Sequence, residues 1–130
     1  MDIELDPNLK VICDFDLYGF TDNNIDTVIT ALSQCLEVEF SQYGELYEAW
    51  GDEDDPYTEL DNYNLYRNFS IEDQKWIIPQ FKQYPIVLYV SVGEDSYQLE
   101  ARLKQAMGDR AVLLSRRTVT LKPARPQESL

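Results

Sequence analysis

The sequence predicts the α/β class: a single small domain in which a three- to four-stranded mixed sheet is packed with three or four helices. Two observations carry this prediction. Apolar segments typical of strands alternate along the chain with segments whose apolar residues recur at helical spacing. The last alternation is a strand, a helix and a strand, which predicts parallel strands joined by a right-handed crossover. The length of 130 residues fits one domain, expected to span 1–122, with a flexible tail at 123–130.

Three segments have the pattern of strands, and the first of them carries two aspartates. In LKVICDFDLY, Phe15 and Leu17 fall on one face while Asp14 and Asp16 fall on the other. This alternation predicts that the aspartates line the exposed face of an edge strand. The three predicted strands span residues 9–18, 85–92 and 111–121.

Helical spacing predicts three helices. The most regular one follows a capping residue, Thr21 or Asp22. The second follows Ser70 in a capping-box-like pattern and contains Pro79, which should kink or split it. Gly108 is expected to close the third. The predicted helices span about 25–36, about 71–83, and the segment from the Asp95/Ser96 cap to Gly108.

Residues 37–50 fit two patterns. Phe40, Tyr43, Tyr47 and Trp50 keep helical spacing, and the same stretch begins with apolar residues between glutamates, as in an alternating strand. The helical spacing is slightly favoured, and the strand stays open. Residues 51–64 are predicted to form an acidic loop.

Charge is distributed unevenly along the chain. The net charge is −13, with 17 acidic residues and one basic residue in 1–66, against 7 acidic and 10 basic residues in 67–130. Residues 37–61 hold ten acidic residues and no basic one, interleaved with aromatic residues. Because like charges at this density repel each other, a basic partner would relieve the repulsion and would be steered toward this segment.

Composition argues against several functional classes. The chain has no histidine, which removes the commonest general base and most zinc sites. Its two cysteines, Cys13 and Cys35, are interpreted as buried thiols. No apolar run reaches the roughly 18 residues of a membrane span, and the acidic N-terminus is unlike a signal peptide. We therefore expect a soluble, cytoplasmic protein without a cofactor or metal and without a membrane partner.

These features favour an interaction protein that binds and blocks a basic partner, such as a nuclease or nucleic-acid-binding protein. Immunity proteins, antitoxins and nucleic-acid mimics work in this way. Direct nucleic-acid binding is not expected, because the acidic residues would repel phosphates. A structural or assembly subunit, with an acidic face that serves only solubility, remains an alternative. The candidate partner-binding residues are Glu37, Glu39, Tyr43, Glu45, Tyr47, Glu48, Trp50, Asp52, Glu53, Asp54, Asp55, Tyr57, Glu59 and Asp61.

A catalytic alternative rests on the aspartate pair. The segment VICDFDLYGFTD resembles the first motif of the haloacid dehalogenase superfamily, an apolar strand followed by Asp-x-Asp-x-Thr. The resemblance implies a Mg²⁺-dependent phosphotransfer enzyme in which Asp14 is the nucleophile and Asp16 the acid/base. It covers about twelve residues of the 130, and Leu17 and Tyr18 stand at that family's Gly-Thr positions.

A second resemblance lies in the acidic half. The segment QYGELYEAW, residues 42–50, is similar to a Tyr-Gly-Glu-Asn…Leu-Trp segment of the barstar family of acidic ribonuclease inhibitors. YPIVLYV, residues 84–90, is similar to that family's second strand, although the two segments lie farther apart here. The resemblance implies the same type of function, inhibition of a basic nuclease.

Overall fold

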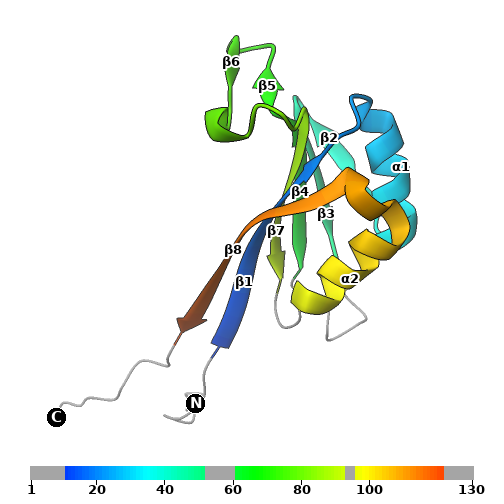
Figure 1. The fold of residues 1–130 in the computed structure, drawn as a ribbon, viewed down its shortest axis with the longest axis vertical. Coiled ribbons are helices and arrows are strands. Elements are labelled where there is room, and N and C mark those ends of the chain that lie inside the picture. Colours follow the sequence, from blue (N-terminus) through cyan, green and yellow to red (C-terminus); the bar gives the residue numbers. More distant parts are fainter. Residues whose placement is uncertain (1–10, 52–60, 93–95, 122–130) are drawn as a thin grey trace, which may run out of the picture.

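The described part of the chain forms a six-stranded antiparallel sheet with two α-helices on one of its faces (Figure 1). The computed structural model describes residues 11–51, 61–92 and 96–121. The predicted three- to four-stranded mixed sheet with three or four helices is therefore wrong, because the fold is dominated by its sheet. The proposed tail at 123–130 and most of the predicted acidic loop lie outside the described residues, but the end of that loop is wrong, since residues 62–64 belong to a strand.

The sheet order is β2-β3-β4-β7-β1-β8, and every neighbouring pair is antiparallel. A separate two-stranded hairpin, β5-β6, projects from one end of the sheet (Figure 1). The elements are β1 (Val11–Phe20), α1 (Ile25–Leu36), β2 (Ser41–Tyr43), β3 (Leu46–Trp50), β4 (Asn62–Arg67), β5 (Phe69–Ser70), β6 (Lys75–Trp76), the 3₁₀ turn Pro79–Phe81, β7 (Ile86–Val92), α2 (Ser96–Met107), the 3₁₀ turn Gly108–Arg110 and β8 (Ala111–Leu121).

The strand-helix-strand unit β7-α2-β8 is present, but its two strands do not pair with each other. Both are antiparallel to β1, which lies between them, so they run in the same direction one position apart. The predicted common direction is confirmed and the predicted mixed sheet is not. The predicted edge position of β1 is also wrong, since strands flank it on both sides.

The favoured helix over 37–50 is wrong, because the segment forms two strands from Ser41 onward. The residues that carried the alternating pattern, at 38–40, lie before these strands. A tight turn at Gly44, whose φ of +62° suits glycine, joins β2 to β3. The predicted helix over 71–83 is also wrong. Its place is taken by the β5-β6 hairpin and a 3₁₀ turn, which converge on the buried side chain of Asn68. That amide donates to the carbonyls of Ile78 and Phe81 and accepts from the Ile78 N–H.

The two predicted helices that are present have clear local causes. Asn24, rather than Thr21 or Asp22, caps α1 by accepting hydrogen bonds from the N–H groups of Asp26 and Thr27. Helix α2 ends at Met107, and Gly108 follows it with a φ of +60°. Both helices pack their apolar sides onto the same face of the sheet. The hydrophobic core lies between the helices and that face.

Gly19 in β1 permits a close contact on the opposite face of the sheet. A Cβ atom built there would lie 2.5 Å from Cγ of Tyr84 and 2.9 Å from a methyl group of Leu114. No real side chain tolerates such distances, so Tyr84 covers this position only because it is glycine.

We expect Gly19→Ala to lower the free energy of unfolding by about 1–3 kcal/mol, the usual cost of overpacking. The added Tyr84→Ala change should recover part of this loss, as measured by urea denaturation. Gly44→Ala is the control, since its cost comes from positive φ and nothing lies within 4 Å of its built Cβ. Losses that Tyr84→Ala does not relieve in the Gly19→Ala background would contradict the steric explanation.

Candidate functional site

The two aspartates of β1 lie on the face of the sheet that the helices cover. Asp16 is fully buried and Asp14 is 8% exposed. The register explains this, because Asp16 lies between Val90 and Arg116 on neighbouring strands, in the layer that faces the helices. The prediction that the aspartates line an exposed strand face is therefore wrong.

Asp16 forms a two-pronged ion pair with Arg116 of β8. Nε and Nη2 of Arg116 each lie 2.9 Å from one carboxylate oxygen, and the Tyr18 hydroxyl donates to the same carboxylate at 2.8 Å. Arg116 also reaches α2, where Nη2 lies 3.1 Å from Glu100 and 3.2 Å from the Ser96 carbonyl oxygen. This network, here called the Asp16–Arg116 cluster, joins β1, β8 and α2.

Asp14 extends the network toward the first turn of α2. Its carboxylate accepts hydrogen bonds from the hydroxyls of Ser96 and Thr118. Burial by itself raises the pKa of Asp14, but these two hydrogen bonds and the nearby Arg116 charge outweigh it and lower the pKa below its usual value. The ionised form of Asp14 is therefore favoured in the folded protein.

The contacts of this cluster indicate a structural role, because they link β1, β8 and α2. The carboxylates of both aspartates already accept hydrogen bonds from neighbouring side chains, whereas a nucleophile must be free to approach its substrate. In the described ranges, no three His, Cys, Asp or Glu side chains are grouped so that they could hold a metal ion. The catalytic roles implied for Asp14 and Asp16 remain an untested hypothesis.

The opposite face of the sheet carries no helix in the part of the chain that the structure describes (Figure 1). Direct cross-strand partners point to the same side, so the register arranges its side chains in rows. The apolar row is Tyr43, Leu46, Tyr66, Val87, Gly19 and Val112. The mixed row is Ser41, Glu48, Asn64, Tyr89, Leu17 and Ser115, and the third row is Trp50, Asn62, Ser91, Phe15 and Arg117.

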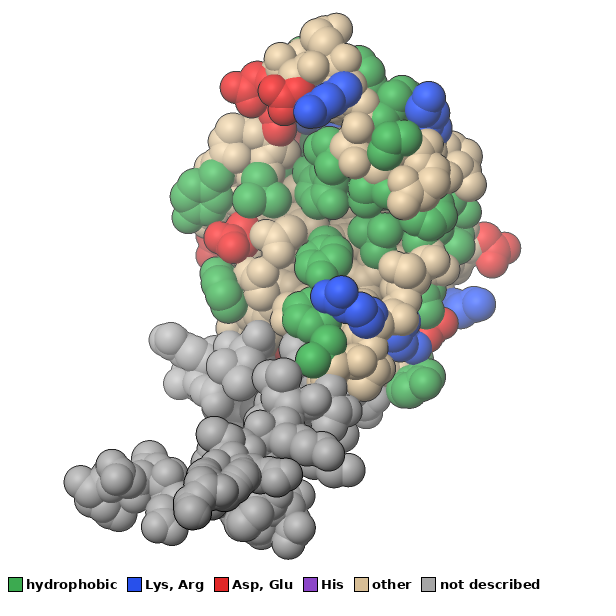
Figure 2. All heavy atoms as spheres, turned by 90° about the vertical axis from the view of Figure 1, so that its left-hand side faces the viewer, with side chains coloured by type: hydrophobic (Ala, Val, Ile, Leu, Met, Phe, Trp, Pro, Cys, Tyr) green, Lys and Arg blue, Asp and Glu red, His purple; other side chains and the backbone are tan. Residues whose placement is uncertain are grey.

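We call this surface the open face. Figure 2 shows it, with hydrophobic side chains over most of its middle and charged side chains mainly toward its margins. Tyr43 and Trp50 are 62% and 59% exposed, and Tyr89 is 36% exposed. Phe15 stacks on Tyr89 with ring centroids 6.1 Å apart, and Arg117 lies over the Phe15 ring at 5.3 Å. Exposed aromatic side chains of this kind are typical of interfaces.

An acidic segment is attached to one end of the open face. Residues 52–60 contain five acidic residues and no basic one. The chain enters this segment after Trp50 and Gly51 and leaves it at Asp61, whose carbonyl accepts a hydrogen bond from Gly51 N–H at 2.9 Å. The described residues on either side of the segment, Gly51 and Asp61, therefore adjoin the Trp50–Asn62 pair of β3 and β4.

The structure divides the fourteen predicted partner-binding residues among several surroundings. Tyr43, Glu48 and Trp50 lie on the open face, and Tyr47 packs against the core on the other side. Glu37 and Glu39 are exposed after α1, Glu45 accepts hydrogen bonds from Ser70 and Ile71 at the β5-β6 hairpin, and Asp61 is buried. Asp52, Glu53, Asp54, Asp55, Tyr57 and Glu59 lie outside the described residues.

The sequence interpretation did not include the aromatic residues in the middle of the open face. Phe15, Tyr66 and Tyr89 come from β1, β4 and β7, far apart in sequence. Alternation in β1 defines two faces of that strand, but it does not tell which one the helices cover. Cys35 is half-buried, as a thiol that donates to the Arg102 carbonyl, and the Cys13 side chain lies outside what the structure describes.

Comparisons with known proteins do not assign the chain to a family. No protein-family model matches the chain, and no curated protein matches it. In the described residues, no helix has the length and apolar character needed to cross a membrane.

We expect Asp16→Asn to destabilise the fold by about 3–5 kcal/mol, because it leaves a largely buried guanidinium without its main partner. Asp22→Asn is the matched control, since Asp22 pairs with the half-exposed Arg110 at 3.5 Å and should cost at most about 1 kcal/mol. Thermal and urea unfolding measure both. Equal losses of unfolding free energy in the two variants would show that the cluster does not stabilise the fold. The double variant Asp16→Leu/Arg116→Leu should be more stable than Asp16→Asn, because it leaves no unpaired buried charge at this pair.

The lowered pKa of Asp14 predicts a pH-dependent contribution to stability. Its stabilising effect is present above the unfolded-state pKa of about 4 and is lost as pH falls through the lower folded-state pKa. The stability difference between the wild type and Asp14→Asn should therefore be largest near neutral pH and should shrink in acid. Urea titrations at several pH values measure it, and a difference that stays constant from neutral pH to about pH 2 would argue against this role.

Proposed function

We propose that the protein is an acidic interaction module that docks its open face on a basic protein and covers that protein's functional surface. The observation that carries the proposal is the open face, which no helix covers in the described ranges and which carries exposed aromatic side chains. In sequence, five acidic residues follow directly after Trp50 and Gly51 of this face. Trp50 and Tyr89 would supply contact energy, and the carboxylates would pair with lysines and arginines of the partner.

Electrostatics support a basic partner rather than an acidic one. The chain has a net charge of −13, and three of the basic residues in its second half form ion pairs with its own carboxylates. These pairs join Arg116 to Asp16 and Glu100, Arg110 to Asp22, and Arg102 to Glu37. Carboxylates beside stacked aromatic rings imitate the phosphates and bases of a nucleic acid. This mimicry favours a nuclease or another nucleic-acid-binding protein as the partner. We also propose that the protein acts in the cytoplasm.

An aromatic sheet face can also stack the bases of single-stranded nucleic acid, so the test must separate the two. Such surfaces need a basic groove for the phosphates. On the open face Arg117 is the basic residue among the three rows, and it lies over Phe15. The charge therefore supports a protein partner over direct binding of nucleic acid.

The proposal is tested by immobilising the protein and capturing partners from source-cell lysate at about 50 and 500 mM salt, with and without nuclease, because screening shortens charge attraction over this range. We expect one stoichiometric basic protein whose retention survives nuclease and weakens with salt. The captured protein is then purified, and its association rate is measured with each variant.

Two comparisons locate the surface, each between a double variant of the proposed surface and a control variant on the helix side. Trp50→Ala with Tyr89→Ala should weaken binding at least tenfold, whereas Tyr97→Ala, an exposed tyrosine on α2, should not. Asp52→Lys with Asp54→Lys should slow association at low salt more than Asp26→Lys with Asp109→Lys, which changes the net charge equally on the helix side. Equal effects of the surface variant and its control would contradict the assigned surface. If nuclease treatment abolishes retention of the captured protein on the immobilised chain, a direct protein partner is contradicted.

A further inference from the structure

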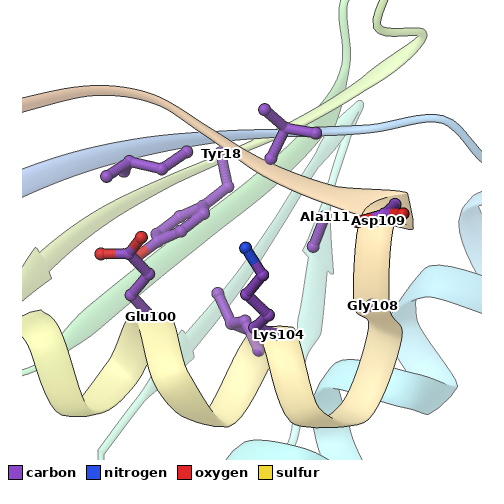
Figure 3. A pocket seen from close by; sticks show the side chains of 9 residues that line it. Tyr18, Glu100, Lys104, Gly108, Asp109 and Ala111 are labelled. Atoms are coloured by element: carbon purple, nitrogen blue, oxygen red, sulfur yellow. The ribbon is translucent and has the colours of Figure 1, made fainter.

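A cavity lies on the helix side of the sheet, away from the open face. It is formed between α2, the 3₁₀ turn Gly108–Arg110 and the start of β8, and its volume is about 410 Å³ (Figure 3). This volume falls within the range of about 300–1,000 Å³ that small-molecule sites occupy. The cavity has no part in the proposed docking of a partner protein.

The cavity is built from an apolar floor and a charged mouth. Tyr18 and Leu103, both 1% exposed, form part of its wall together with Leu113 of β8. Glu100 and Lys104, one turn apart on α2, stand at its mouth (Figure 3). A molecule that enters would therefore meet a lining that is about as polar as it is apolar, with charged groups at the entrance.

The two charged side chains of α2 differ in whether they are already engaged. Glu100 lies 3.1 Å from Arg116, so its charge is largely compensated. Lys104 has no hydrogen bond or ion pair with any residue in the described ranges, and its ammonium group points from α2 toward the strands, over the cavity (Figure 3). The available charge at the centre of the mouth is therefore positive.

The geometry points to a binding site for a small amphipathic carboxylate, with its apolar body against Tyr18, Leu103 and Leu113 and its carboxylate on Lys104. This ligand class fits because the Lys104 ammonium complements one anionic group, and the apolar side chains at the base of the cavity complement a short apolar chain. Asp109, at the far end of the mouth, would disfavour a carboxylate seated there and so sets the direction in which the ligand lies.

Octanoate, octylamine and octanol are the probes, since they share one chain and differ in the head group. Binding is followed by amide chemical shifts of the full-length protein during titration. We expect octanoate to bind more tightly than the other two, with the largest shifts at Lys104, Ala111 and Leu113. Equal binding of octylamine, or shifts that map to the open face around Trp50 and Tyr89, would overturn the assignment.

Variants test the role of the ammonium group. Lys104→Met should weaken octanoate binding about fivefold to tenfold, and Lys104→Arg should keep it, because a charge-assisted hydrogen bond is lost only in the first. Lys75→Met, which removes the same charge on the β5-β6 hairpin, is the control. Ala111→Met should block binding by filling the cavity, with its melting curve showing that the fold is kept. Octanoate binding that Lys104→Met and Lys75→Met leave equally unchanged would refute the site.

Discussion

The ion pair between Asp16 and Arg116 is the interaction on which the rest of the structure depends. It lies under α2, and Arg116 continues to Glu100 and to the Ser96 carbonyl, so one guanidinium ties two strands and a helix together. A charge pair out of water requires good geometry and further hydrogen bonds to offset its desolvation. Tyr18 supplies one of these bonds, and its burial and its contact with Asp16 raise the pKa of its hydroxyl.

The position of this pair distinguishes the two faces of the sheet, because the helices cover the face on which it lies. Because the cluster and the core lie on the helix side, the aromatic residues of the other side are left without a covering helix in the described part of the chain. The cavity beside α2 depends on the same cluster, since Tyr18 and Glu100 take part in both. The proposed partner surface and the proposed ligand site thus lie on opposite sides of one sheet, so each can fail without the other.

The segments with strong local signals were predicted well. The helices predicted over about 25–36 and from the Asp95/Ser96 cap to Gly108, and the strands predicted over 85–92 and 111–121, agree closely with α1, α2, β7 and β8. Ambiguous segments were predicted poorly. Residues 37–50 keep helical spacing, but β2 and β3 form because β4 offers a neighbouring edge to pair with, and propensity yields to such tertiary pairing. The hairpin in place of the helix over 71–83 depends on Asn68 and on Glu45 from another hairpin.

By itself, the sequence determined the local elements with clear periodicity and the concentration of acidic residues in the first half, since both are properties of neighbouring residues. Tertiary structure alone decided which side of β1 faces the core. Alternation separates Asp14 and Asp16 from Phe15 and Leu17, and an apolar side is ordinarily the buried one. Here Arg116, one hundred residues away in sequence, reverses that order by pairing with Asp16. The aspartates turn inward, and the aromatic residues remain on the face left open.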